Sequence, residues 1–174
     1  MNLFKKKIIL LIFFLISSQT LLAETPYFLD FKFILNESDA GKKAQNYLKN
    51  KLEKGIKELK NKEKQIQDEE KKIIQQKKVI AAEDYKKKVA SLRSKVASLQ
   101  KERNSLLEGV AKERKKARNE LLKNLNPIIK DYMNEKKIRM VVDKKSLLLA
   151  DENLNITKDI LAILNKKLKS IKFK

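Results

Sequence analysis

The sequence predicts an α+β protein that is mostly α, in which a small body with a β-sheet carries one long antiparallel helical hairpin. Three observations predict this fold class. The 174 residues include only 3 glycines and 2 prolines, so little interrupts helix formation. Two long stretches repeat apolar residues every seven positions, as helices packed along a narrow stripe do. Short β-like segments flank these stretches, so the two ends of the chain must meet to form a sheet.

The first 23 residues have the layout of a secretory signal peptide. Three lysines, Lys5 to Lys7, precede an apolar run from Ile8 to Ile16 and a polar stretch that ends at Ala23. A membrane-spanning helix needs about 20 continuous apolar residues, and Ser17 interrupts this run. We therefore expect cleavage after Ala23 and export to the periplasm, with an uncleaved membrane anchor as the alternative.

The charge and the missing residue types narrow the function further. Removing residues 1–23 takes away three of the 42 Lys and Arg and none of the 22 Asp and Glu, which leaves a net charge of +17. Such an excess favours anionic partners. The chain has no Cys and no His, which excludes disulfides, Ser-His-Asp and Cys-His nucleophile systems and the usual zinc sites. We therefore expect no enzyme activity and no cofactor.

The N-terminal half of the predicted fold begins with a strand and continues as a helix. The segment from Tyr27 to Leu35 is aromatic-rich and partly alternating, which predicts the first strand. Ser38 follows as a candidate helix cap, with Asp39 in the first turn of the helix. The helix then carries a stripe in which apolar residues recur every seven positions: Leu52, Leu59, Ile66, Ile73 and Ile80.

A second helical register follows and indicates the return helix of a hairpin. One of its series contains Tyr85, Leu92, Leu99 and Leu106, and the other Val89, Val96, Arg103, Val110 and Ala117. Residues 80–86 between the registers are the least periodic, so the hairpin tip is predicted there, with Asp84 as a new cap. The alternative is one unbroken helix from Ser38 to Glu135, roughly 150 Å long. A hairpin is favoured because its two narrow stripes can cover each other.

The C-terminal part predicts two more strands and a short helix. A kink is expected at Pro127, because proline removes a helical hydrogen bond. Ile138 to Asp143 predicts the second strand and Ser146 to Ala150 the third. The final helix is expected from Lys158 to Ser170, with Thr157 as its cap.

These elements divide the chain into a signal peptide (1–23), a β-containing body (24–37 and 121–174) and a helical arm (38–120). The body is too small to bury much core alone, which indicates oligomerisation. The alternating oxygen ligands from Asp151 to Asp159 resemble a calcium loop. They lack its glycine and its final glutamate, so we interpret them as a turn and a helix cap.

Two segments resemble the Skp/OmpH family. Ile34 to Ala44 is similar to its strand-to-helix junction. Ile138 to Asp143, Leu148 to Ala150 and Ile156 to Leu161 are similar to its closing strands and final helix, with Asn155 where an aspartate is common. The resemblance implies a homotrimer whose shared body carries arms around a cavity. It also implies a periplasmic holdase that keeps unfolded outer-membrane β-barrel proteins soluble without ATP.

Residue roles follow as expectations. The oligomerisation body is expected to use Phe31, Ile138, Val141, Leu147 and Leu149. The client-facing surface of the arm is expected to include Tyr85, an aromatic we predict to be exposed, and Lys86, Lys87 and Lys88. The basic charge also favours contact with anionic lipid or lipopolysaccharide. No base-reading element supports specific nucleic-acid binding. The alternatives are an envelope coiled-coil protein that tethers surfaces and, on charge alone, a basic nucleoid-like protein.

Overall fold

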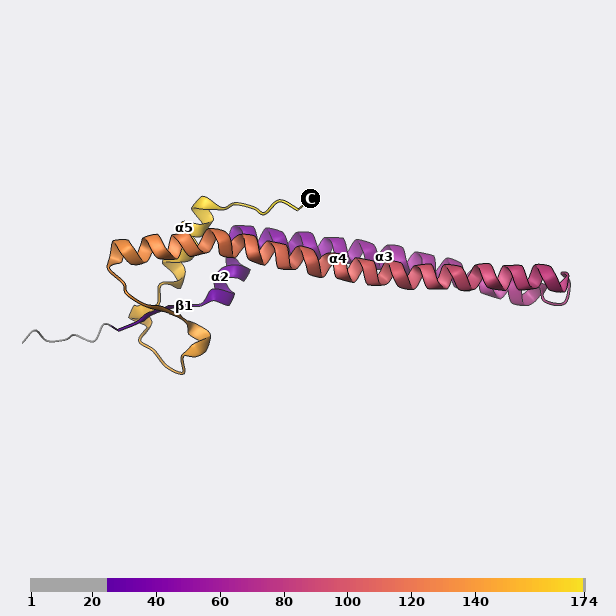
Figure 1. Ribbon diagram of the computed structural model, residues 1–174, viewed down its shortest axis with the longest axis horizontal. Helices are drawn as coiled ribbons and strands as arrows, with labels where there is room; N and C mark the ends of the chain where they lie inside the picture. The colour runs from indigo at the N-terminus through magenta and orange to yellow at the C-terminus, as the bar shows by residue number, and fades with distance from the viewer. Residues whose placement is uncertain (1–24, 174) are drawn as a thin grey trace, which may run out of the picture.

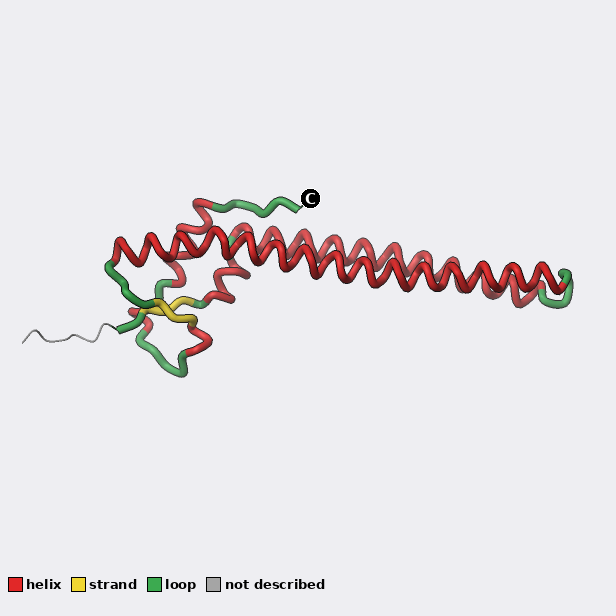
Figure 2. The backbone as a smooth tube through the Cα atoms, in the orientation of Figure 1, coloured by secondary structure: helices red, strands yellow, loops and turns green. Residues whose placement is uncertain are grey.

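The computed structural model describes residues 25–173, so the predicted signal peptide lies outside the described residues. Two long helices form a hairpin, and the other elements gather at its open end (Figures 1 and 2). The elements in chain order are β1 (Tyr27–Leu29), α2 (Phe31–Glu37), α3 (Asp39–Gln76), α4 (Ala82–Lys136), β2 (Val141–Asp143), two 3₁₀ turns (Lys144–Ser146 and Glu152–Leu154) and α5 (Thr157–Lys167). The predicted fold class, mostly α with a small sheet and a long antiparallel hairpin, is confirmed.

We call the hairpin from residue 38 to residue 120 the arm and the rest of the described chain the body. The chain reverses at residues 77–81, so the alternative of one unbroken helix is wrong. The predicted cap at Asp84 is also wrong. α4 begins at Ala82 after Ala81, which makes no side-chain cap bond, and Asp84 lies inside the first turn. Pro127 lies within α4, which continues to Lys136.

The predicted first strand is mostly helix. Only Tyr27–Leu29 forms β1, because the Asp30 carboxylate accepts a hydrogen bond from the Phe33 amide at 2.8 Å and caps α2. The alternation of phenylalanines suggested a strand. The burial instead follows a helical face, since Ile34 is fully buried while Phe33 keeps 44% of its surface exposed.

The sheet has two strands among the described residues, where the sequence predicted three. β1 pairs with β2 in parallel, with Tyr27 opposite Val141 and Leu29 opposite Asp143. The predicted third strand, Ser146 to Ala150, is wrong: after the 3₁₀ turn its leucines continue as irregular chain. An isolated bridge between Phe28 and Asn155 extends the sheet on its other side.

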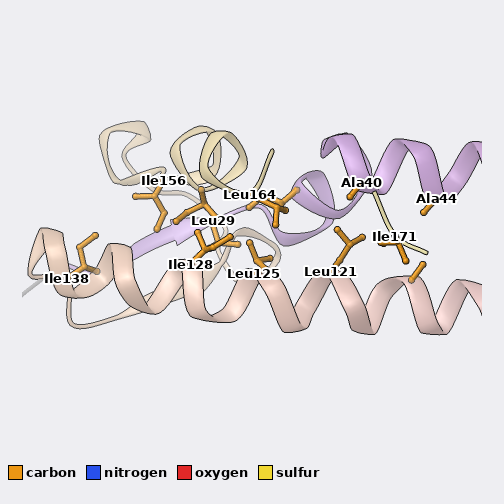
Figure 3. Packing of buried hydrophobic residues seen from close by; sticks show 13 residues of the cluster. Leu29, Ala40, Ala44, Leu121, Leu125, Ile128, Ile138, Ile156, Leu164 and Ile171 are labelled. Atoms are coloured by element: carbon orange, nitrogen blue, oxygen red, sulfur yellow. The ribbon is translucent and has the colours of Figure 1, made fainter. Parts of the chain in front are cut away.

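One apolar cluster holds the body together and extends into the base of the arm (Figure 3). Its buried members come from β1, α2, α3, α4, the segment after α4, α5 and the last residues: Leu29, Ile34, Ala40, Ala44, Ala117, Leu121, Leu125, Ile128, Ile138, Ile156, Ile160, Leu164 and Ile171. Residues over 130 positions apart therefore share one core, and α4 is the wall against which the others pack.

Hydrogen bonds fix the junction between α2 and α3 onto α5. Ser38 is buried and accepts a bond from the Gly41 amide at 3.1 Å, so its predicted role as a helix cap is confirmed. The Asp39 amide donates to Asn165 Oδ1 on α5 at 2.8 Å. The predicted cap at Thr157 is wrong, because Thr157 is already in α5 and its Oγ1 accepts a bond from the Asp30 amide.

A hydrogen bond from Tyr132 on α4 to Asp159 on α5 joins the two helices. The hydroxyl donates to Asp159 Oδ2 at 2.6 Å, and this bond, helped by partial burial, raises the pKa of Tyr132 from 10.0 to about 12. The folded state therefore holds this proton more tightly than the unfolded chain. The stabilisation is fully present below pH 10 and is lost as the pH rises toward 12.

We expect Tyr132→Phe to lower the free energy of unfolding by about 1 kcal/mol at neutral pH, near the low end for a bond to a charged group because the pair is partly exposed. Urea unfolding followed by circular dichroism measures this value. The difference between the two proteins should shrink between pH 10 and 12. A difference that stays constant over this range would show that the bond does not stabilise the fold.

Candidate functional site

The arm is a long helical pair with a sparsely filled apolar seam. α3 has 38 residues and is roughly 57 Å long. The predicted heptad stripe lies in the seam as far as Ile73. Leu59 and Ile73 are buried, Leu52 and Ile66 are half-buried, and Ile80 lies in the turn at residues 77–81. In α4 no residue between Ala82 and Gly109 is fully buried. Because helix stability comes mainly from such packing, the distal arm is the least supported part of the hairpin.

Ion pairs between the helices set the register of the arm. Lys51 pairs with Glu113, Lys62 with Glu102, and Lys95 with Glu69, at N–O distances of 2.5–2.7 Å. Eleven residues separate the first two pairs along both helices, and seven separate the next two, so one antiparallel register holds along the seam. These partly exposed pairs each contribute little stability, but a shift of register would separate all three pairs.

The helices approach closely at the glycine in the middle of α3. A methyl group on Gly55 would lie 2.5 Å from Leu106 Cδ2, so Leu106 packs directly on the glycine backbone. Nearby, Glu113 Oε2 is the buried side-chain oxygen without a hydrogen-bond partner among the described residues. The bond to Glu113 raises the pKa of Lys51, which keeps this lysine charged.

The residues predicted to face clients lie just beyond the tip turn, in the first two turns of α4. Lys86, Lys87 and Lys88 are exposed, but Tyr85 is half-buried, which corrects the prediction of an exposed aromatic. Lys88 Nζ donates to Gln76 Oε1 at 2.6 Å across the tip. The tip therefore presents basic side chains more than an aromatic one, and the exposed apolar residues closest to it are Ile74 and Val79.

The body has an open apolar pocket of about 390 Å³ beside β2. Its walls come from β1, α2, α4 and β2: Leu29, Phe31, Ile129, Met133, Arg139, Met140, Val141, Val142 and Asp143. Phe31 and Val141, two of the residues predicted for oligomerisation, meet here. The sequence did not predict Ile129, Met133 and Met140 as residues of this surface. Met140 could have been included, because it lies within the predicted second strand.

The leucines after β2 form a separate apolar surface. Leu149 is 92% exposed and Leu148 is fully exposed, while Leu147 is half-buried. Ile138, in contrast, is buried in the core of its own chain. The five residues predicted for oligomerisation therefore lie in three places. Phe31 and Val141 line the pocket, Leu147 and Leu149 lie in this leucine segment, and Ile138 lies in the core. We call residues 147–149 the leucine loop.

The oxygen-rich segment from Asp151 to Asp159 forms turns in the structure. No cluster of Asp and Glu among residues 25–173 is placed to hold a metal ion. The side chains of the calcium-like segment instead bond in turns, since Asp151 accepts from the Asn153 amide and Asn155 Oδ1 from the Thr157 amide. None of the described helices is long and apolar enough to cross a membrane.

Known proteins share this architecture. A comparison with curated protein sequences found no significant match. Among solved structures, an OmpH-like protein from Caulobacter crescentus, described as a candidate outer membrane chaperone, superimposes with a TM-score of 0.81. The identity is 21%, and the match covers 87% of this chain and 89% of the other. The family model for outer membrane protein (OmpH-like) matches residues 27–164, from β1 to α5. The match thus includes the arm and both halves of the body, and the chain belongs to the OmpH-like family.

Proposed function

We propose that this protein is an ATP-independent periplasmic holdase that binds unfolded outer-membrane proteins between helical arms and keeps them soluble for insertion. The observation that carries the proposal is membership of the OmpH-like family together with the arm itself. A hairpin with no fully buried residue over the distal half of α4 is poorly supported by packing, and we expect it to bend. Bending arms can enclose clients of different sizes, and no step of this function needs catalysis.

The basic charge of the arm supports the choice of client. Residues 38–120 contain 25 Lys and Arg against 13 Asp and Glu, a net charge of +12. This field attracts acidic polypeptides over a Debye length of about 8 Å at physiological salt. Many weak contacts hold a client while each one breaks easily, so release needs no fuel. The same field favours contact with anionic lipid or lipopolysaccharide surfaces.

The holdase requires several arms around one cavity, and we propose a homotrimer. The pocket beside β2 and the leucine loop are two different apolar surfaces of the body. If the leucine loop of one copy occupies the pocket of the next, the contact is heterologous, and a heterologous contact forms a ring when its rotation closes. A ring of three would bring three arms to one side of a common body, as the family resemblance implies.

The test is whether the mature protein, from Glu24 onward, keeps a urea-unfolded outer-membrane barrel soluble on dilution without ATP. We expect light scattering from the diluted barrel to fall in proportion to the chaperone added. A basic helical protein of similar charge serves as the control for nonspecific attraction. Equal suppression by that control would refute the holdase. The tethering alternative would then remain, although it was predicted to be a continuous rod and this chain reverses at residues 77–81.

A further inference from the structure

The chain beyond α5 turns onto the base of the arm. Residues 168–173, which we call the C-terminal strap, leave the helix and run in extended form beside α3 and α4 (Figures 1 and 2). Lys169 Nζ lies 3.3 Å from Asp39 Oδ2 in the first turn of α3. The Phe173 ring stacks on Tyr47 of α3, with the ring centroids 4.3 Å apart and the planes 8° from parallel. The strap therefore follows the first turns of α3.

The strap packs against small side chains at the base of the arm. Ile171 is buried and shares the apolar cluster with Ala40 and Ala44 on α3 and with Ala117 on α4. Figure 3 shows Ile171 between the two arm helices, close to Ala44. Three alanines at the base of the seam leave space that larger residues, such as Leu59, fill farther along the arm. Removal of the strap would expose these alanines as an apolar surface between α3 and α4.

The attachment of the strap is shallow. The Leu168 amide still bonds to the Leu164 carbonyl, but among the described residues no backbone hydrogen bond ties residues 169–173 to another element. One buried isoleucine, one stacked ring and one exposed ion pair hold residues 169–173, and the half-buried Leu168 packs on the core before them. Because these few contacts must offset the lost conformational entropy of five residues, displacement of the strap is easy.

We propose that the strap is a displaceable occupant of a peptide-binding groove at the base of the arm, and that an extended segment of an unfolded client replaces it. This inference rests on the proposed holdase function. The present occupant defines the ligand: an extended peptide with an aliphatic residue in the groove and an aromatic residue two positions later on Tyr47. Strands of outer-membrane barrels carry apolar residues at alternate positions, often with aromatic residues near their ends, so they present the same pattern.

The test links the strap covalently to α3. Because the natural chain has no cysteine, only introduced thiols react. Asp39→Cys with Lys169→Cys, which keeps Tyr47, is bridged by a short bis-maleimide, and the same variant capped at both thiols by N-ethylmaleimide is the matched control. The probe is a fluorescent peptide with the strap sequence, residues 168–173, and a second titration uses an unfolded outer-membrane barrel. We expect at least about tenfold weaker peptide binding by the bridged protein, because its binding-competent fraction falls toward zero.

A second variant releases the strap without altering the walls of the groove. Ile171→Asp removes the apolar anchor, and we expect it to bind the strap peptide several-fold more tightly than the unmodified chain. Circular dichroism shows whether both variants keep their helices. Equal peptide affinities of the bridged, capped and Ile171→Asp proteins would overturn the groove. If the peptide affinities differ among these proteins but none of them binds the unfolded barrel, the groove is supported and the holdase function is refuted.

Discussion

Gly41→Ala is expected to unfold or strongly destabilise the protein, because its new methyl group would collide with backbone. A Cβ at this position would lie 2.0 Å from the carbonyl oxygen of Leu35 and 2.8 Å from Ser38 Oγ. A flexible side chain could rotate away, but a carbonyl near the end of α2 cannot. α2 would have to move off α3, although Ile34 and Ser38 are both fully buried at this junction. We expect a loss of about 3 kcal/mol or more, at the upper end for overpacking, from a total of about 5–15 kcal/mol.

Urea unfolding followed by circular dichroism measures this loss, and the chain supplies a matched control. Gly109 is also a helical glycine, but a Cβ there would meet nothing within 4 Å. Gly109→Ala should therefore raise the free energy of unfolding, by up to about 1 kcal/mol, through the better helix propensity of alanine. Opposite signs at the two glycines are the expected result. Equal unfolding midpoints would mean that α2 and α3 are not packed as described.

Leu149→Asp is expected to dissociate the proposed homotrimer. The leucine is 92% exposed in the single chain, so the substitution leaves the fold of the monomer unchanged. In the assembly it would replace an apolar contact by a desolvated carboxylate among mostly apolar walls, which is costly. We expect a cost of at least about 2 kcal/mol at each interface, as for a central contact residue. Sedimentation velocity should then show monomers where the unmodified chain shows a trimer.

Two further substitutions separate this surface from general effects of charge. Val141→Asp changes the opposite side of the same proposed contact, in the pocket, and should also dissociate the oligomer. Val79→Asp introduces the same charge at a valine that is 81% exposed at the far tip of the arm, and should leave the trimer intact. An intact trimer after both Leu149→Asp and Val141→Asp would refute this placement of the interface.

Local sequence signals predicted the arm because its structure is local and repetitive. The stripe from Leu52 to Ile73 lies at the seam as predicted, and the Ser38 cap acts over three residues through the Gly41 amide. The tip was placed a few residues too late, since no glycine or proline marks the turn at residues 77–81. Ala81 makes no side-chain cap bond at the start of α4, so the prediction fell on Asp84, a nearby residue of a capping type.

The body was harder to predict because partners distant in sequence decide its elements. Phe31 to Leu35 was predicted as part of a strand, but burial of Ile34 against the core and capping by Asp30 select a helix. The leucine loop has the composition of a strand but no strand to pair with in the described chain, and an unpaired strand is not stable in water. The proposed roles of Leu149 in assembly and of Lys86 to Lys88 in client binding remain predictions.

The sequence by itself determined the two long helical stretches, the basic charge of the arm and the resemblance to the family, because periodicity, composition and short motifs depend on neighbouring residues. Only the tertiary structure decided which apolar groups are covered and which stay open. The Tyr47–Phe173 stack joins residues 126 positions apart, and the pocket beside β2 collects side chains from four elements. Such contacts form only where folding brings distant segments together, so no local sequence pattern predicts them.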